Sequence, residues 1–258
     1  YFWNPSVSYE ESDVSVYPVG SSTATAEARI TESQVRFEVG REIGDTAEVR
    51  LGLFYRQLVP EITTGFVDFP DSSFNLAGIS LKYREDTLND RSFPDEGKWL
   101  DVNYDYGSST LGSDESYHRL DIQGGKAWKK GKHHLIASGS IGSTFSDDTI
   151  ITERFNLGGF ARLSGLEDDQ LSGNHYLHGL GAYYYDLAGI PKIAGLNAGV
   201  ILETGNAWNS TGDVSLGDSL FSAAAFVGAK TIIGPAYLGA GITEGYEPRY
   251  FLQFGRAF

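Results

Sequence analysis

The sequence predicts an all-β fold, namely a transmembrane antiparallel β-barrel of about sixteen strands. Three observations support this prediction. Apolar and polar residues alternate with a period of two, no apolar run approaches the roughly 18 residues of a membrane helix, and aromatic residues and glycines are spread along the whole chain. The 258 residues include 15 Tyr, 15 Phe and 32 Gly, a composition that suits strands joined by tight turns.

The segment 47–56 displays the alternation most clearly. Because successive side chains of a strand point to opposite faces, one face of this segment would be apolar and the other charged. The apolar face carries Ala47, Val49, Leu51, Leu53 and Tyr55, and the charged face carries Glu48, Arg50 and Arg56. A helix would mix these two sets, so the segment is predicted to be a strand.

The segments 76–84, 98–106 and 196–203 repeat this pattern. Alternation alone would also fit a soluble β-sandwich, whose apolar face lies in a shared core. Length and aromatic ends favour a membrane barrel, which needs strands of about 9 to 11 residues flanked by aromatic girdles. Aromatic residues stand near the segment ends at Tyr55, Tyr83, Tyr104, Tyr106 and Trp128.

One composition extends through the whole chain without a linker, so residues 1–258 are predicted to form one domain. Its short connection Lys129–Lys132 is expected to face the periplasm, and its longer polar connection Asp86–Gly97 the outside. The chain starts at Tyr1 and not with Met. We therefore expect it to be a piece of a longer protein whose secretory signal lies upstream.

The sequence contains no recognisable catalytic or cofactor motif. Gly-x-Ser-x-Gly, His-Glu-x-x-His and a phosphate-binding glycine loop are all absent. His175 and His178 are three residues apart, hence on opposite faces of a strand, and we assign them to the surface or an interface. The net charge of -14 argues against nucleic acid as a partner. We expect no enzyme activity, no cofactor and no metal site.

The stretch from Glu153 to Leu166 interrupts the alternation, and its paired glycines predict a sharp turn. It resembles the long-loop motif of the bacterial surface antigen family, the superfamily of outer-membrane assembly and two-partner-secretion barrels. That motif reads Phe-x-x-Gly-Gly, a short spacer and then Arg-Gly-Phe/Tyr. The residues in register with it are Phe155, Gly158, Gly159 and Gly165.

Two positions depart from the motif, since Ser164 replaces its Arg and Leu166 replaces its Phe or Tyr. In the family, the long loop folds into the barrel and that Arg reaches an acidic residue of the inner wall, so the resemblance implies an inward-folded long loop here. The resemblance implies that Glu203 and Gly205 are the corresponding wall residues. We expect Arg162 to supply the missing charge and pair with Glu203; alternatively, it only caps a turn. The predicted lumenal loop motif comprises Gly158, Gly159, Arg162, Leu163, Ser164, Gly165 and Leu166.

The carboxyl end carries a second resemblance, to the terminal signal by which outer-membrane barrels are recognised for insertion. Its residues are Tyr250, Leu252, Phe254 and the terminal Phe258. This resemblance implies a location in the bacterial outer membrane. It also implies outer-membrane lipid and the barrel assembly machinery as partners. The acidic clusters Asp147–Asp148 and Glu167–Asp169 add lipopolysaccharide, bridged by divalent ions, as an expected partner.

Within the superfamily, Leu202–Trp208 and the stretch Arg162–Leu166 look most like the barrels of patatin-like type Vd autotransporters. The resemblance implies a translocator that exports or anchors an N-terminal patatin-like lipase passenger by type V secretion. The passenger and a periplasmic domain would precede this chain. The alternatives are a factor that inserts other outer-membrane barrels, a passive porin or ligand-binding barrel, and a soluble β-sandwich. A homo-oligomer is compatible with each of them.

Overall fold

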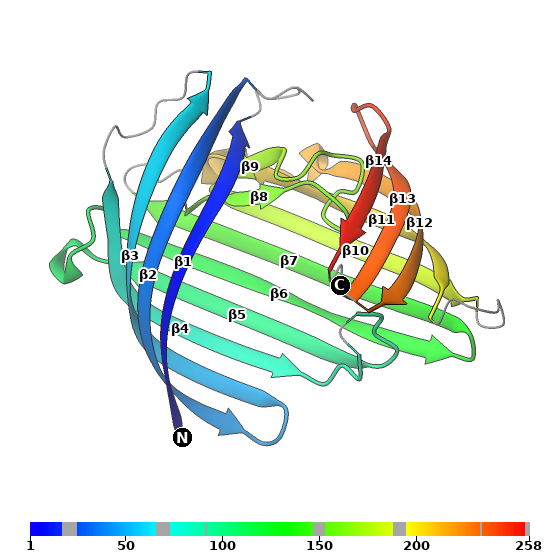
Figure 1. The fold of residues 1–258 in the computed structure, drawn as a ribbon, viewed down its shortest axis with the longest axis horizontal. Helices are drawn as coiled ribbons and strands as arrows, with labels where there is room; N and C mark the ends of the chain where they lie inside the picture. The colour runs from blue at the N-terminus through cyan, green and yellow to red at the C-terminus, as the bar shows by residue number, and fades with distance from the viewer. Residues whose placement is uncertain are drawn as a thin grey trace.

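The computed structural model describes residues 1–16, 25–65, 73–90, 92–146, 153–187, 195–232 and 234–255. The regular structure is β-strand, as predicted, apart from short 3-10 turns (Figure 1). The strands are β1 (Phe2–Val16), β2 (Ala26–Ile43), β3 (Ala47–Thr64), β4 (Phe74–Asp86), β5 (Gly97–Gly107), β6 (Tyr117–Lys130), β7 (His133–Ser146), β8 (Phe155–Leu157), β9 (Leu171–Gly173), β10 (His175–Asp186), β11 (Asn197–Trp208), β12 (Leu220–Thr231), β13 (Gly234–Thr243) and β14 (Arg249–Phe254). The 3-10 turns are η1 (Ser109–Leu111), η3 (Thr211–Asp213) and η4 (Leu216–Asp218). Within the described ranges, no helix has the length and apolar character of a membrane span.

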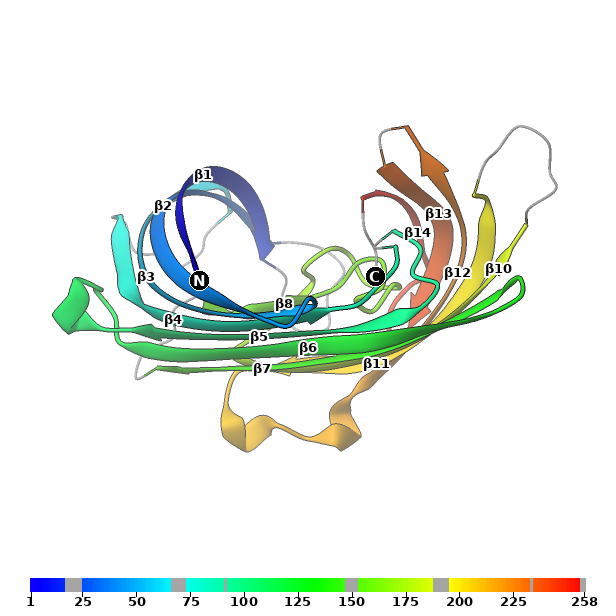
Figure 2. The same cartoon turned by 90° about the horizontal axis from the view of Figure 1, so that it is seen from below.

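The strands form one strongly curved antiparallel sheet in which spatial neighbours are also neighbours in sequence (Figures 1 and 2). Only the step from β7 to β10 skips two strands, because β8 and β9 pair with each other as a separate hairpin. The order of the main sheet makes β1 and β14 its two edges. In the described part of the chain, each edge strand pairs on one side only.

The main sheet has 12 strands among the described residues, fewer than the expected number of about sixteen. The difference follows from strand length. β2 and β3 have 18 residues each, whereas the prediction assumed strands of about 9 to 11 residues. With longer strands, the same number of residues forms fewer strands.

The convex face of the sheet is apolar, whereas the concave face carries buried charged residues together with buried apolar clusters. On β11, Leu202 is 66% exposed on the convex face, while Glu203 is buried on the concave face. The exposed apolar side chains include Val35, Phe37, Leu51, Leu53, Leu81, Leu135, Ile141, Val200, Phe221 and Leu238. A continuous apolar surface of this kind suits lipid and is unfavourable in water. A soluble β-sandwich would bury this face instead.

A short turn joins β6 to β7 at one end of the sheet. Gly131 and Lys132 alone join β6 to β7, and Gly131 has a φ of 63°, as two-residue hairpin turns require. The connection 87–96 lies at this same end, because β4–β5 and β6–β7 are alternate hairpins of one antiparallel meander. Lys129 indeed lies 2.8 Å from Asp95. The expectation that Asp86–Gly97 and Lys129–Lys132 face opposite sides is therefore wrong.

Candidate functional site

The long connection between β7 and β10 returns over the concave face of the sheet (Figure 2). Its described part contains the β8–β9 hairpin and the predicted glycine pair. Gly158 and Gly159 have φ angles of 135° and 95°, which favour glycine. Their N–H groups donate to the carbonyls of Arg162 (2.8 Å) and Leu166 (3.2 Å), respectively. These bonds close the sharp turn that the sequence predicts, and we call residues 153–174 the long loop.

The long loop contacts the wall of the sheet at Glu203, on β11. The buried Glu203 carboxylate accepts hydrogen bonds from the backbone N–H groups of Leu163 and Ser164, both at 2.8 Å. It also accepts a bond from the Ser164 hydroxyl at 2.6 Å. Hydrogen bonds to a charged acceptor are stronger than those between neutral groups. The carboxylate therefore holds two consecutive residues of the long loop against β11.

The expected ion pair between Arg162 and Glu203 does not form. The Arg162 guanidinium is exposed and donates to the carbonyl of Asn156, in β8, at 2.6 Å. The physical reason is the backbone at Ala161 and Leu163, whose φ angles are 62° and 73°. These left-handed residues turn N–H groups toward the wall and leave the Arg162 side chain within the loop, so this residue has the alternative, local role.

Ser164 occupies the position of the family's Arg and makes the side-chain contact itself. We expect Ser164→Ala to weaken the attachment by about 1.5–3 kcal/mol, because it removes a buried bond to a carboxylate. Arg162→Ala leaves all three Glu203 bonds in place and should have a smaller effect. Proteinase K digestion of the long loop in folded protein compares the two variants. Equal sensitivity would contradict this assignment.

The histidines that the sequence assigned to the surface or an interface are buried on the sheet. His175 and His178 are each 6% exposed, and the His178 imidazole lies 3.3 Å from Glu203. His178 lies on the concave face, where the long loop covers it, so its surface assignment is wrong. His175 lies on the opposite face of β10, as the spacing predicts, with its ring centroid 5.6 Å from that of Phe145. Gly205, the other predicted wall residue, packs against β10: a Cβ there would lie 2.5 Å from the Leu177 carbonyl oxygen.

Gly165 lets the long loop lie directly on the backbone of β13. A Cβ at Gly165 would lie 2.3 Å from backbone atoms of Ile242 and Thr243. The approach is close from both sides, since a Cβ at Gly241 would lie 2.5 Å from the Ser164 carbonyl oxygen. Backbone atoms at such positions cannot move aside cheaply, so glycine is required on both sides of the contact.

We expect Gly165→Val to push the long loop away from β13 and to destabilise the folded protein by about 1–3 kcal/mol or more, as overpacking does. Gly181→Val is the matched control, because a Cβ at that exposed position would have no atom within 4 Å. The stability of both variants is measured as the temperature at which the folded band disappears in semi-native electrophoresis. A control that unfolds at the same lowered temperature as Gly165→Val would exclude the steric explanation.

A second attachment of the long loop is one that the sequence analysis missed. Glu153 is buried, and its carboxylate lies 2.5 Å from the guanidinium of Arg56, on β3, and 3.9 Å from that of Arg119, on β6. Arg56 also donates to the hydroxyl of Tyr117 at 3.0 Å. This ion pair joins the start of the long loop to strands on the opposite side of the concave face.

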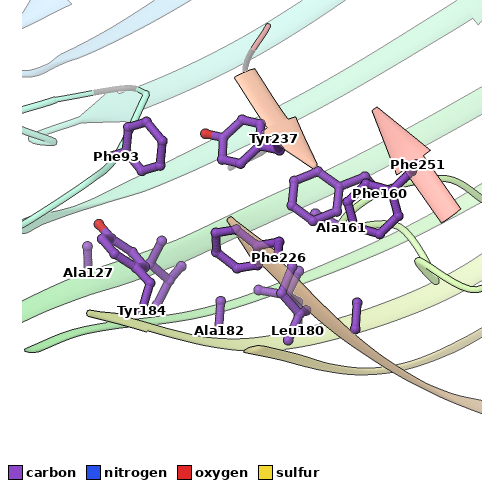
Figure 3. Close-up of a cluster of buried hydrophobic side chains, with 13 residues drawn as sticks. Phe93, Ala127, Phe160, Ala161, Leu180, Ala182, Tyr184, Phe226, Tyr237 and Phe251 are labelled. Atoms are coloured by element: carbon purple, nitrogen blue, oxygen red, sulfur yellow. The ribbon is translucent and has the colours of Figure 1, made fainter. Parts of the chain in front are cut away.

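The last strand holds the far side of the same loop. Arg249, the first residue of β14, donates to the Leu166 carbonyl at 2.6 Å and lies 3.0 Å from the Glu167 carboxylate. Figure 3 shows Phe160 of the long loop beside Phe251 of β14, and their ring centroids are 4.5 Å apart. The long loop is thus attached to β3, β11 and β14.

The residues of the predicted insertion signal lie on β14 next to these contacts. Tyr250, Leu252 and Phe254 are exposed on the convex face, on the opposite side of the strand from Phe251. Phe258 lies outside the described residues. The alternate apolar residues of β14 that face outward are compatible with an insertion signal. That the assembly machinery recognises them stays a prediction.

Comparison with known proteins gave one family and several similar structures. The model of the Omp85 superfamily domain matches residues 3–243. BamA from Haemophilus ducreyi lacking POTRA domains 1–3 has a TM-score of 0.76 at 15% identity, covering 97% of this chain and 57% of that one. CdiB from Escherichia coli has a TM-score of 0.63 at 15% identity, covering 90% and 44%. CdiB from Acinetobacter baumannii has a TM-score of 0.60 at 13% identity, covering 97% and 46%.

The chain therefore spans about half the length of these similar structures. At these identities the likeness concerns the fold alone. A comparison with curated proteins gave no match.

Proposed function

The chain belongs to the Omp85 superfamily, and on that premise we propose that it is the barrel of a protein that moves polypeptide across or into the bacterial outer membrane. The family itself consists of outer-membrane barrels, and the apolar convex face suits that location. The observation that carries the proposal is the attachment of the long loop to Glu203. A constricting loop without a link to Glu203 would instead favour a passive porin.

In its finer form, the proposal is that the barrel delivers or displays an N-terminal passenger, with a patatin-like lipase as the expected class. The resemblance of Leu202–Trp208 and Arg162–Leu166 to the barrels of patatin-like autotransporters supports this form. The charged part of the concave face, which includes Glu38, Arg50 and Lys82, would line a hydrated path for the polypeptide. The chain's own part is transport, and the chemistry would belong to the passenger.

A second candidate function is insertion of other barrels into the membrane. It is favoured by the edges of the sheet, because β1 and β14 each pair on one side only within the described ranges. Unpaired strand edges present N–H and C=O groups that can pair with an incoming strand.

One experiment separates the two functions. An epitope is fused ahead of Tyr1 behind a secretory signal, and external protease is added to intact cells. Removal of the epitope is expected if the barrel carries its N-terminal neighbour outward. An intact periplasmic marker protein controls for leakage, and heat-dependent mobility controls for folding. Protection of the epitope on a correctly folded barrel would overturn the translocator function and favour the insertion factor.

A further inference from the structure

A second connection, between β4 and β5, also enters the concave face with its described residues 87–90 and 92–96, which we call the plug. Neighbouring antiparallel strands can be joined by about two residues, so the plug is much longer than this join requires. Its central Phe93 is 3% exposed. Figure 3 shows this ring beside Tyr184 and Tyr237, which belong to β10 and β13. The plug thus reaches strands far from its own in the sheet.

Two tyrosine hydroxyls bind the backbone of the plug. Tyr184 donates to the Pro94 carbonyl at 2.6 Å, and Tyr237 donates to the Ser92 carbonyl at 2.7 Å. The Phe93 ring contacts both tyrosine rings, with its centroid 6.0 Å from that of Tyr184 and 5.2 Å from that of Tyr237. The carbonyls on both sides of one aromatic residue are therefore bound, as in the recognition of a peptide ligand.

Charged side chains hold both ends of the plug. Asp90 forms an ion pair with Lys230, on β12. At the other end, the Asp95 carboxylate lies 2.8 Å from the Lys129 ammonium group, on β6, and 2.8 Å from the His134 imidazole, on β7. All of these partners come from strands that the plug does not connect. These contacts therefore fix the plug in one position on the concave face. They are not needed to connect β4 with β5.

We propose that the surface beneath the plug is a peptide-binding site, which recognises an aromatic side chain between two carboxylates. The plug occupies this site until a transported polypeptide segment with the same chemistry replaces it; in this respect the proposal rests on the proposed function. Gly228 makes room for the aromatic ring, because a Cβ there would lie 3.0 Å from Phe93. The site consists of Lys129, His134, Tyr184, Gly228, Lys230 and Tyr237.

The same aromatic cluster connects the plug with the long loop. The ring of Phe160, from the long loop, lies 5.0 Å from the ring of Tyr237. Tyr237 therefore packs between Phe93 and Phe160, which come from connections at opposite ends of the sheet. Departure of the plug uncovers one side of Tyr237 and removes packing that supports the long loop. Emptying of the site during exchange can thus act on the long loop through Tyr237.

The first test measures the exposure of the plug. The chain contains no Cys, so Ser92→Cys places a single thiol in the plug for maleimide labelling of the purified protein. We expect Phe93→Ala to raise the labelling rate at least about tenfold, because it removes a buried aromatic anchor, and Lys230→Ala to raise it as well. Lys130→Ala, an exposed lysine at the same end, is the matched control. Equal labelling rates in all four proteins would overturn the proposal.

The second test asks whether the site exchanges its ligand. A synthetic peptide with the sequence of residues 88–96 is added in excess to the Ser92→Cys protein. The expected result is faster labelling, whereas the same peptide with Ala in place of Phe93 has no effect. Unchanged labelling with the first peptide would overturn ligand exchange. Neither test involves export, so failure here is distinguishable from failure of the epitope experiment.

Discussion

Glu203→Ala is expected to detach the long loop from the wall. The N–H groups of Leu163 and Ser164 and the Ser164 hydroxyl would all lose their acceptor. A buried donor without a partner costs about 1–3 kcal/mol, so we expect a loss of about 3–6 kcal/mol after some relaxation of the loop. The temperature at which the folded band disappears in semi-native electrophoresis should fall, and proteinase K should cut the long loop faster.

Two further variants make this expectation specific. Glu203→Gln retains one carbonyl oxygen as an acceptor and should be intermediate between wild type and Glu203→Ala. Glu244→Ala removes an exposed acid next to β13 and should leave both measurements unchanged. If Glu203→Ala kept the wild-type transition and protease resistance, the attachment would be unimportant. The proposed transport function would then lose the observation that carries it.

The faces of the strands could be predicted from the sequence, because a strand has an obligatory period of two. Once Leu202 is assigned to lipid, Glu203 must face the concave side, and the structure agrees. The position of the long loop could be predicted as well, because a glycine pair and an interrupted alternation mark it. Both predictions depend on local pattern, which one sequence contains in full.

The group that meets Glu203 could not be predicted in the same way. Charge complementarity favoured Arg162, whereas the backbone at Ala161 and Leu163 decides the outcome. Left-handed φ angles are uncommon at residues other than glycine, so neither residue signals this turn. The preference for an ion pair also neglected that backbone N–H groups satisfy a buried carboxylate as well as a guanidinium does.

Contacts across the concave face were beyond prediction for a different reason. Glu153 and Arg56 are 97 positions apart, and Tyr237 and Ser92 are 145 apart. Their meeting depends on the curvature of the whole sheet and not on any local period. The plug was misplaced for another reason. Its side depends on the number of strands between it and the turn after β6, whereas the prediction relied on the length of the connection.

The second large effect is expected for Glu153→Ala. Arg56, whose side chain is only 14% exposed in the intact pair, loses its closest carboxylate. Removing one partner of a buried ion pair costs about 3–5 kcal/mol, because the remaining charge is poorly solvated. The thermal transition should therefore fall by a margin comparable with that of Glu203→Ala. Proteinase K should cut near the start of the long loop first.

The double variant Arg56→Met, Glu153→Met tests whether an unpaired charge causes this loss. Replacing both charges with apolar side chains removes the cost of burying either one, so the double variant should regain most of the stability that Glu153→Ala loses. A double variant as unstable as Glu153→Ala would point instead to lost packing around Tyr117.

Combining Glu153→Ala with Glu203→Ala then measures whether the two attachments act together. Both hold the same loop, so a loop already released from Glu203 has less to lose at Arg56. Substitutions that share one structural element are generally not additive. We therefore expect the combined loss to be smaller than the sum of the single losses. A fully additive loss would mean that the two ends of the long loop are held independently, and that movement at the wall is not transmitted to β3.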